Sequence, residues 1–242
     1  MAGKAQGLKP EPSQPRNGNR ILAGLPPDEY DLLAPHLQAV SLTLTQVLFR
    51  TNDQISHVYF PNDSIVSLLT DLSDGQGMEV GLVGAEGIVG VSAILGGRET
   101  KVATVQGSGR ALKVPAQKLR ETFQLGGKLQ KLLLAYTHFL LTQVSQSVVC
   151  NSKHPLDGRL ARWLLMYNDR LGRNEFELTQ EFMASMLGVR RAGVSEVAAI
   201  LQDRGLIRYR RGRIMILDRK GLEALTCECY SVVKEGGDAL LS

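Results

Sequence analysis

TQEFMASMLGVRRAGVSEV, the stretch from Thr179 to Val197, predicts two short helices joined by a tight turn. Thr179 can accept hydrogen bonds from the free backbone N–H groups that open the first helix. Gly188 stands where the chain must turn, because a residue without a Cβ adopts a positive φ at little cost. Apolar residues recur at helical spacing in the second segment, at Val194, Val197, Ala198 and Leu201. The stretch therefore predicts a second helix that is buried on one face and exposes arginines at its N-terminal end.

Arginine is concentrated in and just after this second helix. Residues 190–213 contain two acids, Glu196 and Asp203, against seven arginines: Arg190, Arg191, Arg204, Arg208, Arg210, Arg211 and Arg213. The net charge of the whole chain is only +4, so most of the positive excess lies here. Gly205 ends the helix, and two alternately apolar strands follow on either side of Arg211-Gly212, a pair that suits a hairpin turn. This hairpin is typical of a wing beside a helix–turn–helix.

The arginine fork donates two parallel hydrogen bonds to a phosphate or to the edge of a guanine, so we predict double-stranded DNA as the partner of this surface. The residues expected to face base edges are Arg190, Arg191, Ser195 and Glu196. Those expected mainly to contact phosphates are Gln180, Arg208, Arg210, Arg211 and Arg213, with Thr179 as the helix cap. The alternative is a ligand-binding module whose winged helix docks protein, with the arginines as a solvated face. The agreement of spacing, charge and wing favours DNA.

These residues give the chain a resemblance to the Crp/Fnr family of bacterial transcription regulators. Three blocks carry it: His154-Pro155-Leu156, RLARWLL at residues 159–165, and the block from Leu178 to Leu206. The resemblance extends more loosely upstream and covers nearly everything after residue 20. It implies a homodimeric, sequence-specific DNA-binding regulator in the cytoplasm, with a pseudo-palindromic operator and with RNA polymerase as a further partner.

The second helix departs from the family's pattern at two positions. Arg191 stands where the family's first base-reading arginine belongs. Ala192 occupies the place of the glutamate that usually follows, and Glu196 the place of the arginine on the next turn. The resemblance therefore supports the class of regulator, and it does not imply the family's usual operator sequence.

Length and composition fit two modest domains and argue against other classes. The chain has 242 residues, of which 43% are hydrophobic. Residues 1–19 lack an apolar stretch and predict a disordered tail with no secretory signal. The longest apolar run, within residues 128–149, is interrupted by Lys131 and His138 and does not predict a membrane span. Three cysteines, Cys150, Cys227 and Cys229, make no disulfide framework, which favours a reducing cytoplasm. We interpret them as ordinary cysteines and expect no metal site and no cofactor.

The N-terminal half changes from a short helix to many short β-like runs. The helix is predicted from Asp28 to Val40, with Leu32, Leu33 and Leu37 facing inward. The predicted strands, separated by turns such as Ser73–Gly77, are Leu42–Leu44, Val47–Phe49, His57–Phe60, Ile65–Leu69, Met78–Val83, Ile88–Val89, Lys101–Gln106 and Arg110–Val114. Short strands at this spacing predict an antiparallel, jelly-roll-like β-roll around a cavity able to hold a small ligand.

Two possible functions of that cavity, a metal-dependent active site and a cyclic-nucleotide site, can be compared with the residues present. A metal-dependent enzyme needs several histidines and carboxylates at one site, and the four histidines (36, 57, 138 and 154) are scattered, so we predict no enzyme. A cyclic-nucleotide cassette of the family's kind carries Gly-Glu and, about ten residues later, Arg-Ser or Arg-Thr. The corresponding residues here are our candidate ligand-binding set: Gly90, Val91, Ser92, Thr100 and Lys101.

This candidate set lacks the chemistry of the cassette. Val91 accepts no hydrogen bond, and Lys101 offers a point charge in place of the arginine fork. We therefore expect a small-molecule effector other than a cyclic nucleotide, or a purely structural roll; a cyclic-nucleotide-responsive regulator is the alternative.

The two halves are connected by helical sequence. A short helix is predicted from Gln117 to Phe123, and after Gly126-Gly127 a long one from Lys128 to Cys150. A heptad-like seam, predicted as the dimer interface, comprises Leu129, Leu133, Tyr136, Leu140, Gln143 and Ser147, while Leu132, Phe139 and Val148 face a second partner. Such a dimer places two recognition helices about 34 Å apart, one turn of DNA.

The sequence thus predicts an α+β protein with four segments. They are a disordered tail (1–19), a β-roll sensory domain (20–115), a connector and dimerisation helix (116–150) and a winged helix–turn–helix DNA-binding domain (151–242).

Overall fold

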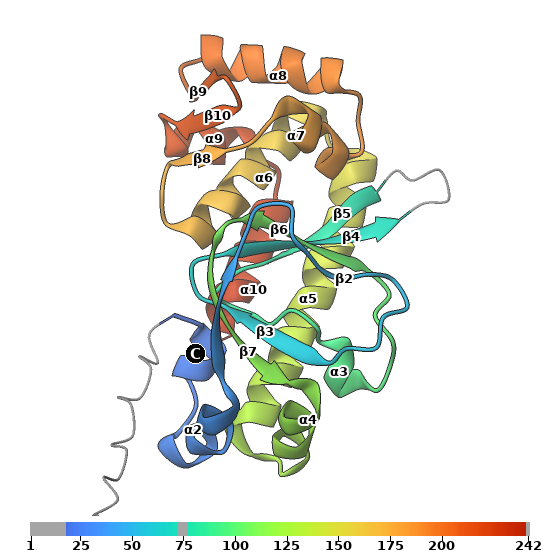
Figure 1. Cartoon of the computed structure of the whole chain (residues 1–242). Helices are drawn as coiled ribbons and strands as arrows, with labels where there is room; N and C mark the ends of the chain where they lie inside the picture. The colour runs from blue at the N-terminus through green and yellow to red at the C-terminus, as the bar shows by residue number, and fades with distance from the viewer. Residues whose placement is uncertain (1–17, 72–76, 241–242) are drawn as a thin grey trace, which may run out of the picture.

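The computed structural model describes residues 18–71 and 77–240. They form a β-roll, a long helix that runs along its side, and a mainly helical domain that covers one end of the roll (Figure 1). This arrangement confirms the predicted fold class: an antiparallel roll, a long connecting helix and a C-terminal winged helix–turn–helix.

The N-terminal segment is ordered from its first described residues. The predicted tail lies outside the described residues up to position 17, but Asn19 is buried. Its Oδ1 accepts from the N–H groups of Ile21 and Leu22 and caps α1 (Arg20–Ala23), and its Nδ2 donates to the carbonyl of Gly87 at 2.8 Å. The prediction of disorder is therefore wrong for Asn19, because an amide side chain with backbone partners anchors the chain to the roll.

The helix predicted from Asp28 to Val40 is much shorter. α2 spans Pro27–Leu33, a 3₁₀ turn spans Ala34–His36, and the chain enters β1 at Gln38. Pro35 has no N–H with which to continue the helical ladder. Leu33 is buried as predicted, whereas Leu32 is 49% exposed.

Two antiparallel sheets build the roll. One has the strand order β1-β7-β3: Gln38–Leu42, Gly109–Pro115 and His57–Pro61. The other has the order β2-β6-β4-β5: Val47–Phe49, Val102–Gly107, Ile65–Asp71 and Gly77–Val83. The turn predicted at 73–77 lies outside the described residues except for Gly77. Side chains such as Phe60, Ile65 and Leu82 fill the space between the sheets and are at most 1% exposed.

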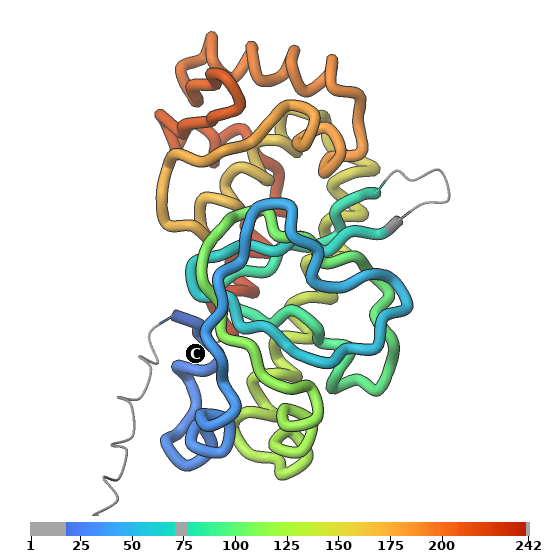
Figure 2. The backbone as a smooth tube through the Cα atoms, in the orientation of Figure 1, coloured from blue at the N-terminus to red at the C-terminus, as the bar shows by residue number. Residues whose placement is uncertain are grey.

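Two predicted strands are wrong. The first strand ends at Leu42 instead of running from Leu42 to Leu44, and Thr45, with φ +67°, belongs to the turn that follows. Ile88–Val89 forms only an isolated bridge between Val89 and Tyr59. At one end of the roll, α2 and α4 (Ala116–Gln124) lie side by side, at the end of the molecule opposite α8 (Figure 2). A short helix, α3 (Ser92–Leu95), precedes β6.

The long helix α5 (Gly127–Lys153) packs against the roll of its own chain. Tyr136 donates through its hydroxyl to the carbonyl of Ile88 at 3.1 Å. Gln143 accepts from the N–H of Leu82 at 2.9 Å and donates to its carbonyl at 3.1 Å. By length and composition alone α5 could cross a membrane, but a third or more of that stretch is buried inside the protein.

The seam predicted for a second subunit is therefore an internal one. Each of its members is buried in this chain: Leu129, Leu133, Tyr136, Leu140, Gln143 and Ser147. Leu132 and Phe139 are buried as well, whereas Val148 is 59% exposed. The polar residues of this seam, Tyr136, Gln143 and Ser147, have hydrogen-bond partners within their own chain. Apolar residues occupy more than one face of α5, and the roll covers the face that periodicity alone assigned to a partner.

The C-terminal domain follows directly after α5. Its elements are α6 (Leu156–Leu171), β8 (Glu175–Glu177), α7 (Gln180–Leu187), α8 (Arg191–Asp203), β9 (Ile207–Arg210), β10 (Arg213–Ile216), α9 (Arg219–Leu225) and α10 (Cys229–Ala239). The three strands pair in the order β8-β10-β9, and α10 returns along α5 toward the roll (Figure 1).

Candidate nucleic-acid interface

The turn between α7 and α8 has the predicted geometry. Thr179 caps α7 by accepting from the N–H of Phe182 at 3.1 Å. Gly188 adopts φ +62°, which closes α7 in a left-handed conformation, and Val189 donates back to the carbonyl of Ala184 at 3.0 Å. These contacts fix the angle at which α8 leaves the turn.

One face of α8 is buried and the other is open. Val194, Ala198 and Leu201 are at most 1% exposed and pack on the rest of the domain, whereas Arg191 and Glu196 are exposed. In Figure 1, α8 lies across the end of the molecule farthest from α2 and α4, with its length uncovered. The helix is thus free over its whole outer face to enter a groove about as wide as a helix.

Two of the residues predicted to contact DNA are hydrogen-bonded to each other. The hydroxyl of Ser195 in α8 donates to Oε1 of Gln180 in α7 at 2.6 Å, and both side chains are half-buried. The bond ties the first helix of the motif to the second. Arg190 precedes α8 as its N-cap residue and is exposed beside Arg191.

The wing is a tight two-residue hairpin. Arg211 and Gly212 have φ +50° and +75°, as a type I′ turn requires, and β9 and β10 pair on either side. Among the described residues, no carboxylate lies within ion-pair distance of the exposed arginines of the motif: Arg190, Arg191, Arg208, Arg210 and Arg211. Arg213 differs, because its guanidinium pairs with Glu177 at 3.0 Å and with Glu175 at 3.9 Å.

A hydrogen-bond network joins the roll to this domain at Glu79 of β5. Its carboxylate accepts from Nε1 of Trp163 in α6 at 2.9 Å, from Nε2 of Gln106 in β6 at 3.0 Å and from the hydroxyl of Ser67 in β4. Burial raises the pKa of Glu79 to about 7, although the three donors act in the opposite direction. The sequence does not reveal this residue, because one acid in an apolar strand normally faces water.

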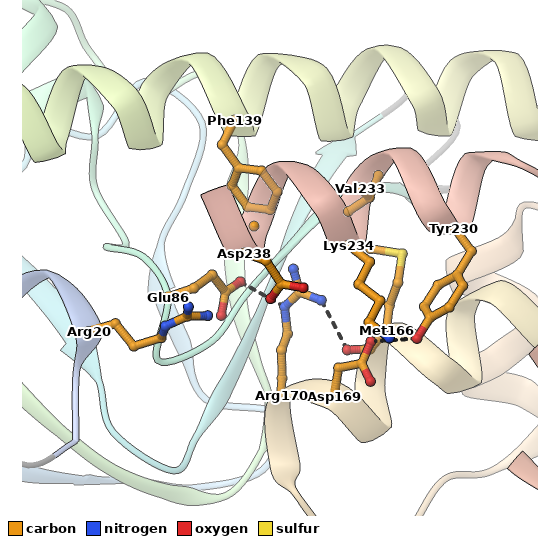
Figure 3. Close-up of a pocket in the computed structure, with 11 residues that line it drawn as sticks. Arg20, Glu86, Phe139, Met166, Asp169, Arg170, Tyr230, Val233, Lys234 and Asp238 are labelled. Atoms are coloured by element: carbon orange, nitrogen blue, oxygen red, sulfur yellow. Dashed lines mark hydrogen bonds and ion pairs between the residues drawn. The ribbon is translucent and has the colours of Figure 1, made fainter. Parts of the chain in front are cut away.

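A second polar link lies in a hollow between the roll, α5, α6 and α10 (Figure 3). Nε of Arg170 in α6 pairs with Oε1 of Glu86 in the roll at 2.8 Å, and both side chains are at most 10% exposed. At the other end of the hollow, the hydroxyl of Tyr230 in α10 donates to Asp169 of α6 at 2.9 Å, which links α10 to α6 (Figure 3). The C-terminal domain is therefore held against the roll through two buried carboxylates, those of Glu79 and Glu86.

Two family models match the chain, and together they span both halves. The model of the cyclic nucleotide-binding domain matches residues 39–125, and that of the Crp-like helix-turn-helix domain matches residues 158–225. The chain belongs to the Crp/Fnr family. The expectation drawn from the sequence is thus confirmed, and the protein is a Crp/Fnr-type transcription regulator with a DNA-binding helix–turn–helix.

Solved structures of Crp/Fnr regulators share the fold. A putative Crp/Fnr regulator from Eubacterium rectale is 19% identical, with a TM-score of 0.67 over 85% of this chain and 96% of that one. FixK2 from Bradyrhizobium japonicum is 17% identical, with a TM-score of 0.69 over 79% and 98%. The c-di-GMP-responsive regulator CLP from Xanthomonas campestris is 15% identical, with a TM-score of 0.63 over 78% and 98%. No curated protein matches the chain in sequence.

A buried acid, Glu99, lies in the loop that contains the candidate ligand-binding residues. Three of the five candidate ligand-binding residues, Ser92, Thr100 and Lys101, contact Glu99, which is 7% exposed, whereas no such contact is made by Gly90 or Val91 among the described residues. Its carboxylate accepts from the hydroxyl of Ser92 at 2.8 Å and from the backbone N–H groups of Thr100 and Lys101 at 2.9 and 3.2 Å. The side chain of Glu99 thus occupies these three hydrogen-bond donors of the loop. Sequence reasoning missed Glu99, because its partners are defined only by the fold of the loop.

Proposed function

We propose that this regulator reads a pseudo-palindromic operator as a homodimer through the outer face of α8. The observation that carries the proposal is the exposure of Arg190 and Arg191 at the N-terminal end of a helix whose opposite face is buried. Because no part of the described chain covers that outer face, a major groove can receive it without a rearrangement of the protein.

The roles of the side chains follow from their positions. Arg190, Arg191 and Glu196 face base edges, and Ser195 with Gln180 forms a linked polar pair at the same surface. The unpaired wing arginines Arg208, Arg210 and Arg211 contact phosphates, which supply affinity and little sequence preference. Thr179 acts as the cap of α7, and Arg213, held by Glu177, contributes less than the other arginines.

A corrected dimer seam supports the homodimer. Among the exposed residues of α5, one series recurs at intervals of three and four: Lys131, Leu134, His138, Leu141, Ser145, Val148 and Ser152. Leu134, Leu141 and Val148 stand seven residues apart and are 49%, 62% and 59% exposed. A sustained heptad of this kind pairs with a second copy of the same helix. The seam lies on the face of α5 that the roll leaves open.

The signal that controls DNA binding acts, in this proposal, on the contact between roll and DNA-binding domain. Glu79–Trp163 and Glu86–Arg170 are the polar links that an effector would bias toward one of two domain orientations. The occupied donors around Glu99 favour an effector other than a cyclic nucleotide. The regulator works in the cytoplasm, where DNA and RNA polymerase are its further partners.

Selection of bound sequences from random duplex DNA tests the proposal. The full-length protein should enrich a two-fold symmetric site with half-sites one helical turn apart. Its affinity for that site should fall steeply as salt rises, because phosphate contacts release counterions. A protein-docking winged helix would enrich no sequence and would show no salt-sensitive binding to duplex DNA.

A further inference from the structure

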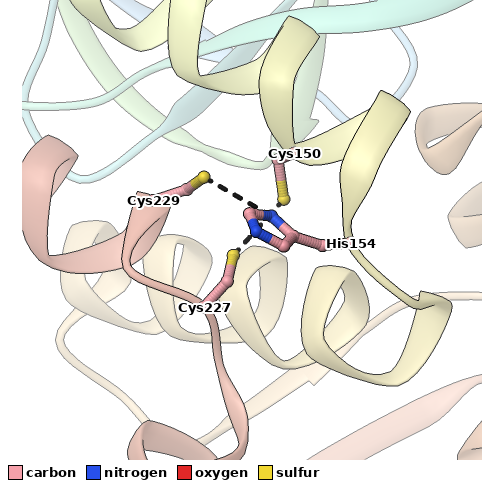
Figure 4. A group of neighbouring side chains, drawn as sticks. All are labelled: Cys150, His154, Cys227 and Cys229. Atoms are coloured by element: carbon pink, nitrogen blue, oxygen red, sulfur yellow. Dashed lines mark hydrogen bonds between the residues drawn. The ribbon is translucent and has the colours of Figure 1, made fainter.

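The fold brings every cysteine of the chain to one place, together with one histidine (Figure 4). Cys150 lies in the last turn of α5. His154, four residues after Cys150, directly follows the helix. Cys227 follows α9, and Cys229 opens α10. One ligand atom from each of the four residues lies within 4.8 Å of the other three. Segments separated by more than seventy residues in sequence thus converge on a single point.

The distances within this cluster suit one tetrahedral metal ion. Sγ of Cys150 lies 3.6 Å from Sγ of Cys227, and Sγ of Cys229 lies 3.6 Å from Nδ1 of His154. Zinc holds thiolate sulfur at about 2.3 Å and imidazole nitrogen at about 2.0–2.1 Å, which places neighbouring tetrahedral ligands about 3.5–3.8 Å apart. A disulfide needs its sulfurs at about 2.05 Å. A cluster of four irons holds its thiolates farther apart than this group allows.

The second nitrogen of His154 has the partner that a metal-bound imidazole usually has. Nε2 of His154 lies 3.5 Å from a carboxylate oxygen of Glu228, the residue between the two C-terminal cysteines. A carboxylate in this position fixes the tautomer and the orientation of a ligating imidazole. The ring is therefore held with Nδ1 toward the three sulfurs.

Charge gives an independent argument. Arg162 is buried, and within the described part of the chain its Nε has no hydrogen-bond partner, while a terminal nitrogen donates to the hydroxyl of Ser147 at 3.3 Å. Among the described residues no carboxylate pairs with it. The guanidinium is close enough to Cys150 and Cys229 to interact with both electrostatically. Three thiolates, one neutral imidazole and one Zn²⁺ carry a net charge of −1, which compensates the buried cation.

We propose that Cys150, His154, Cys227 and Cys229 bind one Zn²⁺ ion as a closed structural site. On binding, the three thiols release three protons and all four ligands are engaged, so no position stays open for a substrate. The ion would join the end of α5 to the junction of α9 and α10. It therefore fixes the boundary between the long helix and the DNA-binding domain, where a small rotation changes the separation of two recognition helices.

The test begins with the metal content of the full-length wild-type protein, expressed in zinc-supplemented medium and purified under reducing conditions without a chelating column. Mass spectrometry of the metals should find about one zinc ion per chain. After exchange for Co²⁺, the spectrum should show sulfur-to-cobalt charge transfer and the visible bands of tetrahedral cobalt. The double variant Cys227→Ser/Cys229→Ser should lose zinc, and His36→Gln, which changes a histidine outside the site, should retain it.

The proposal would be overturned by a folded wild-type protein that contains less than about a tenth of a zinc ion per chain and gives no thiolate–cobalt band. A disulfide among the three cysteines in the freshly purified protein, or iron in place of zinc, would overturn it as well. If the double variant does not fold, the metal content and the cobalt spectrum of the wild-type protein still decide the question.

Discussion

The indole N–H of Trp163 donates a 2.9 Å hydrogen bond to the carboxylate of Glu79, and this bond crosses the boundary between the DNA-binding domain and the roll. Its acceptor is a buried acid, Glu79, whose pKa is raised to about 7 by burial. The contact that orients the recognition helix relative to the roll is therefore coupled to a titration near neutral pH.

The stability of the protein should fall as the pH rises toward and through neutrality. The folded-state pKa of Glu79, about 7, lies above the ordinary value of 4.5, so the folded protein keeps a proton that the unfolded chain releases between these values. This contribution to the free energy of unfolding is complete below pH 4.5 and is lost as the pH rises through about 7. The total loss amounts to at most about 3 kcal/mol. Urea unfolding at a series of pH values measures the slope.

Glu79→Gln should reduce that slope, because the variant stays neutral at every pH. Glu235→Gln, at an exposed acid of α10, is the matched control and should keep the wild-type slope. An identical slope in Glu79→Gln and the wild type would show that Glu79 is not the titrating group.

The approach of α5 to the roll should depend on Gly87. A Cβ at this position would overlap the ring of Tyr136, whose hydroxyl donates to the neighbouring Ile88 carbonyl at 3.1 Å. Gly87→Ala should therefore displace a buried ring and cost about 1–3 kcal/mol or more in the free energy of unfolding. Gly97→Ala has no atom within 4 Å of its new methyl group and should change stability little. Equal stability of the two variants in chemical denaturation would refute this packing.

The exposed seam of α5 should hold the dimer. Leu141 is 62% exposed at the middle of the heptad, so Leu141→Glu places two like charges opposite each other in a symmetric pair. We expect the variant to sediment as a folded monomer in analytical ultracentrifugation. Leu32→Glu, at a leucine of α2 that is 49% exposed, should remain dimeric. A dimeric Leu141→Glu variant would place the interface elsewhere.

The wing arginines should differ in their contribution to DNA affinity. Arg211 is exposed at the tip and forms no ion pair with any described carboxylate, whereas Arg213 is paired with Glu177 at 3.0 Å. Arg211→Ala should weaken binding to all sequences alike and reduce the salt slope by about one. Arg213→Ala should have a smaller effect, because the interaction that it loses is partly internal. Binding titrations at several salt concentrations measure both, and a larger effect of Arg213→Ala would reverse the proposed roles.

The parts of the fold that were predicted correctly from the sequence are those determined by residues close together in the chain. The turn at Gly188 and the hairpin at Arg211-Gly212 follow from backbone conformations that few residues adopt, and the face of α8 follows from a period of 3.6. The prediction of the dimer seam on α5 was wrong because the apolar periodicity of this helix fits two faces. Which face packs on the roll depends on contacts such as that with Leu82, a residue far away in sequence.

The residues that sequence reasoning missed depend on long-range contacts. Glu79 and Glu99 become functional candidates only when the fold surrounds a carboxylate with donors. Cys150 and Cys227 are 77 positions apart, so their spacing carries no metal-binding signature. The local pattern that could have indicated the site is Cys150-x₃-His154 at the end of a helix, and the sequence analysis did not use it.

The most direct test of the account is the affinity of Arg191→Ala for the selected operator, measured beside Arg50→Ala, which removes an exposed arginine of the roll. We predict that Arg191→Ala loses about 5- to 150-fold in affinity and relaxes the preference at one base pair of each half-site, while Arg50→Ala binds as the wild type does. An Arg191→Ala protein that keeps both the affinity and the base preference would contradict the assignment of α8 as the recognition helix.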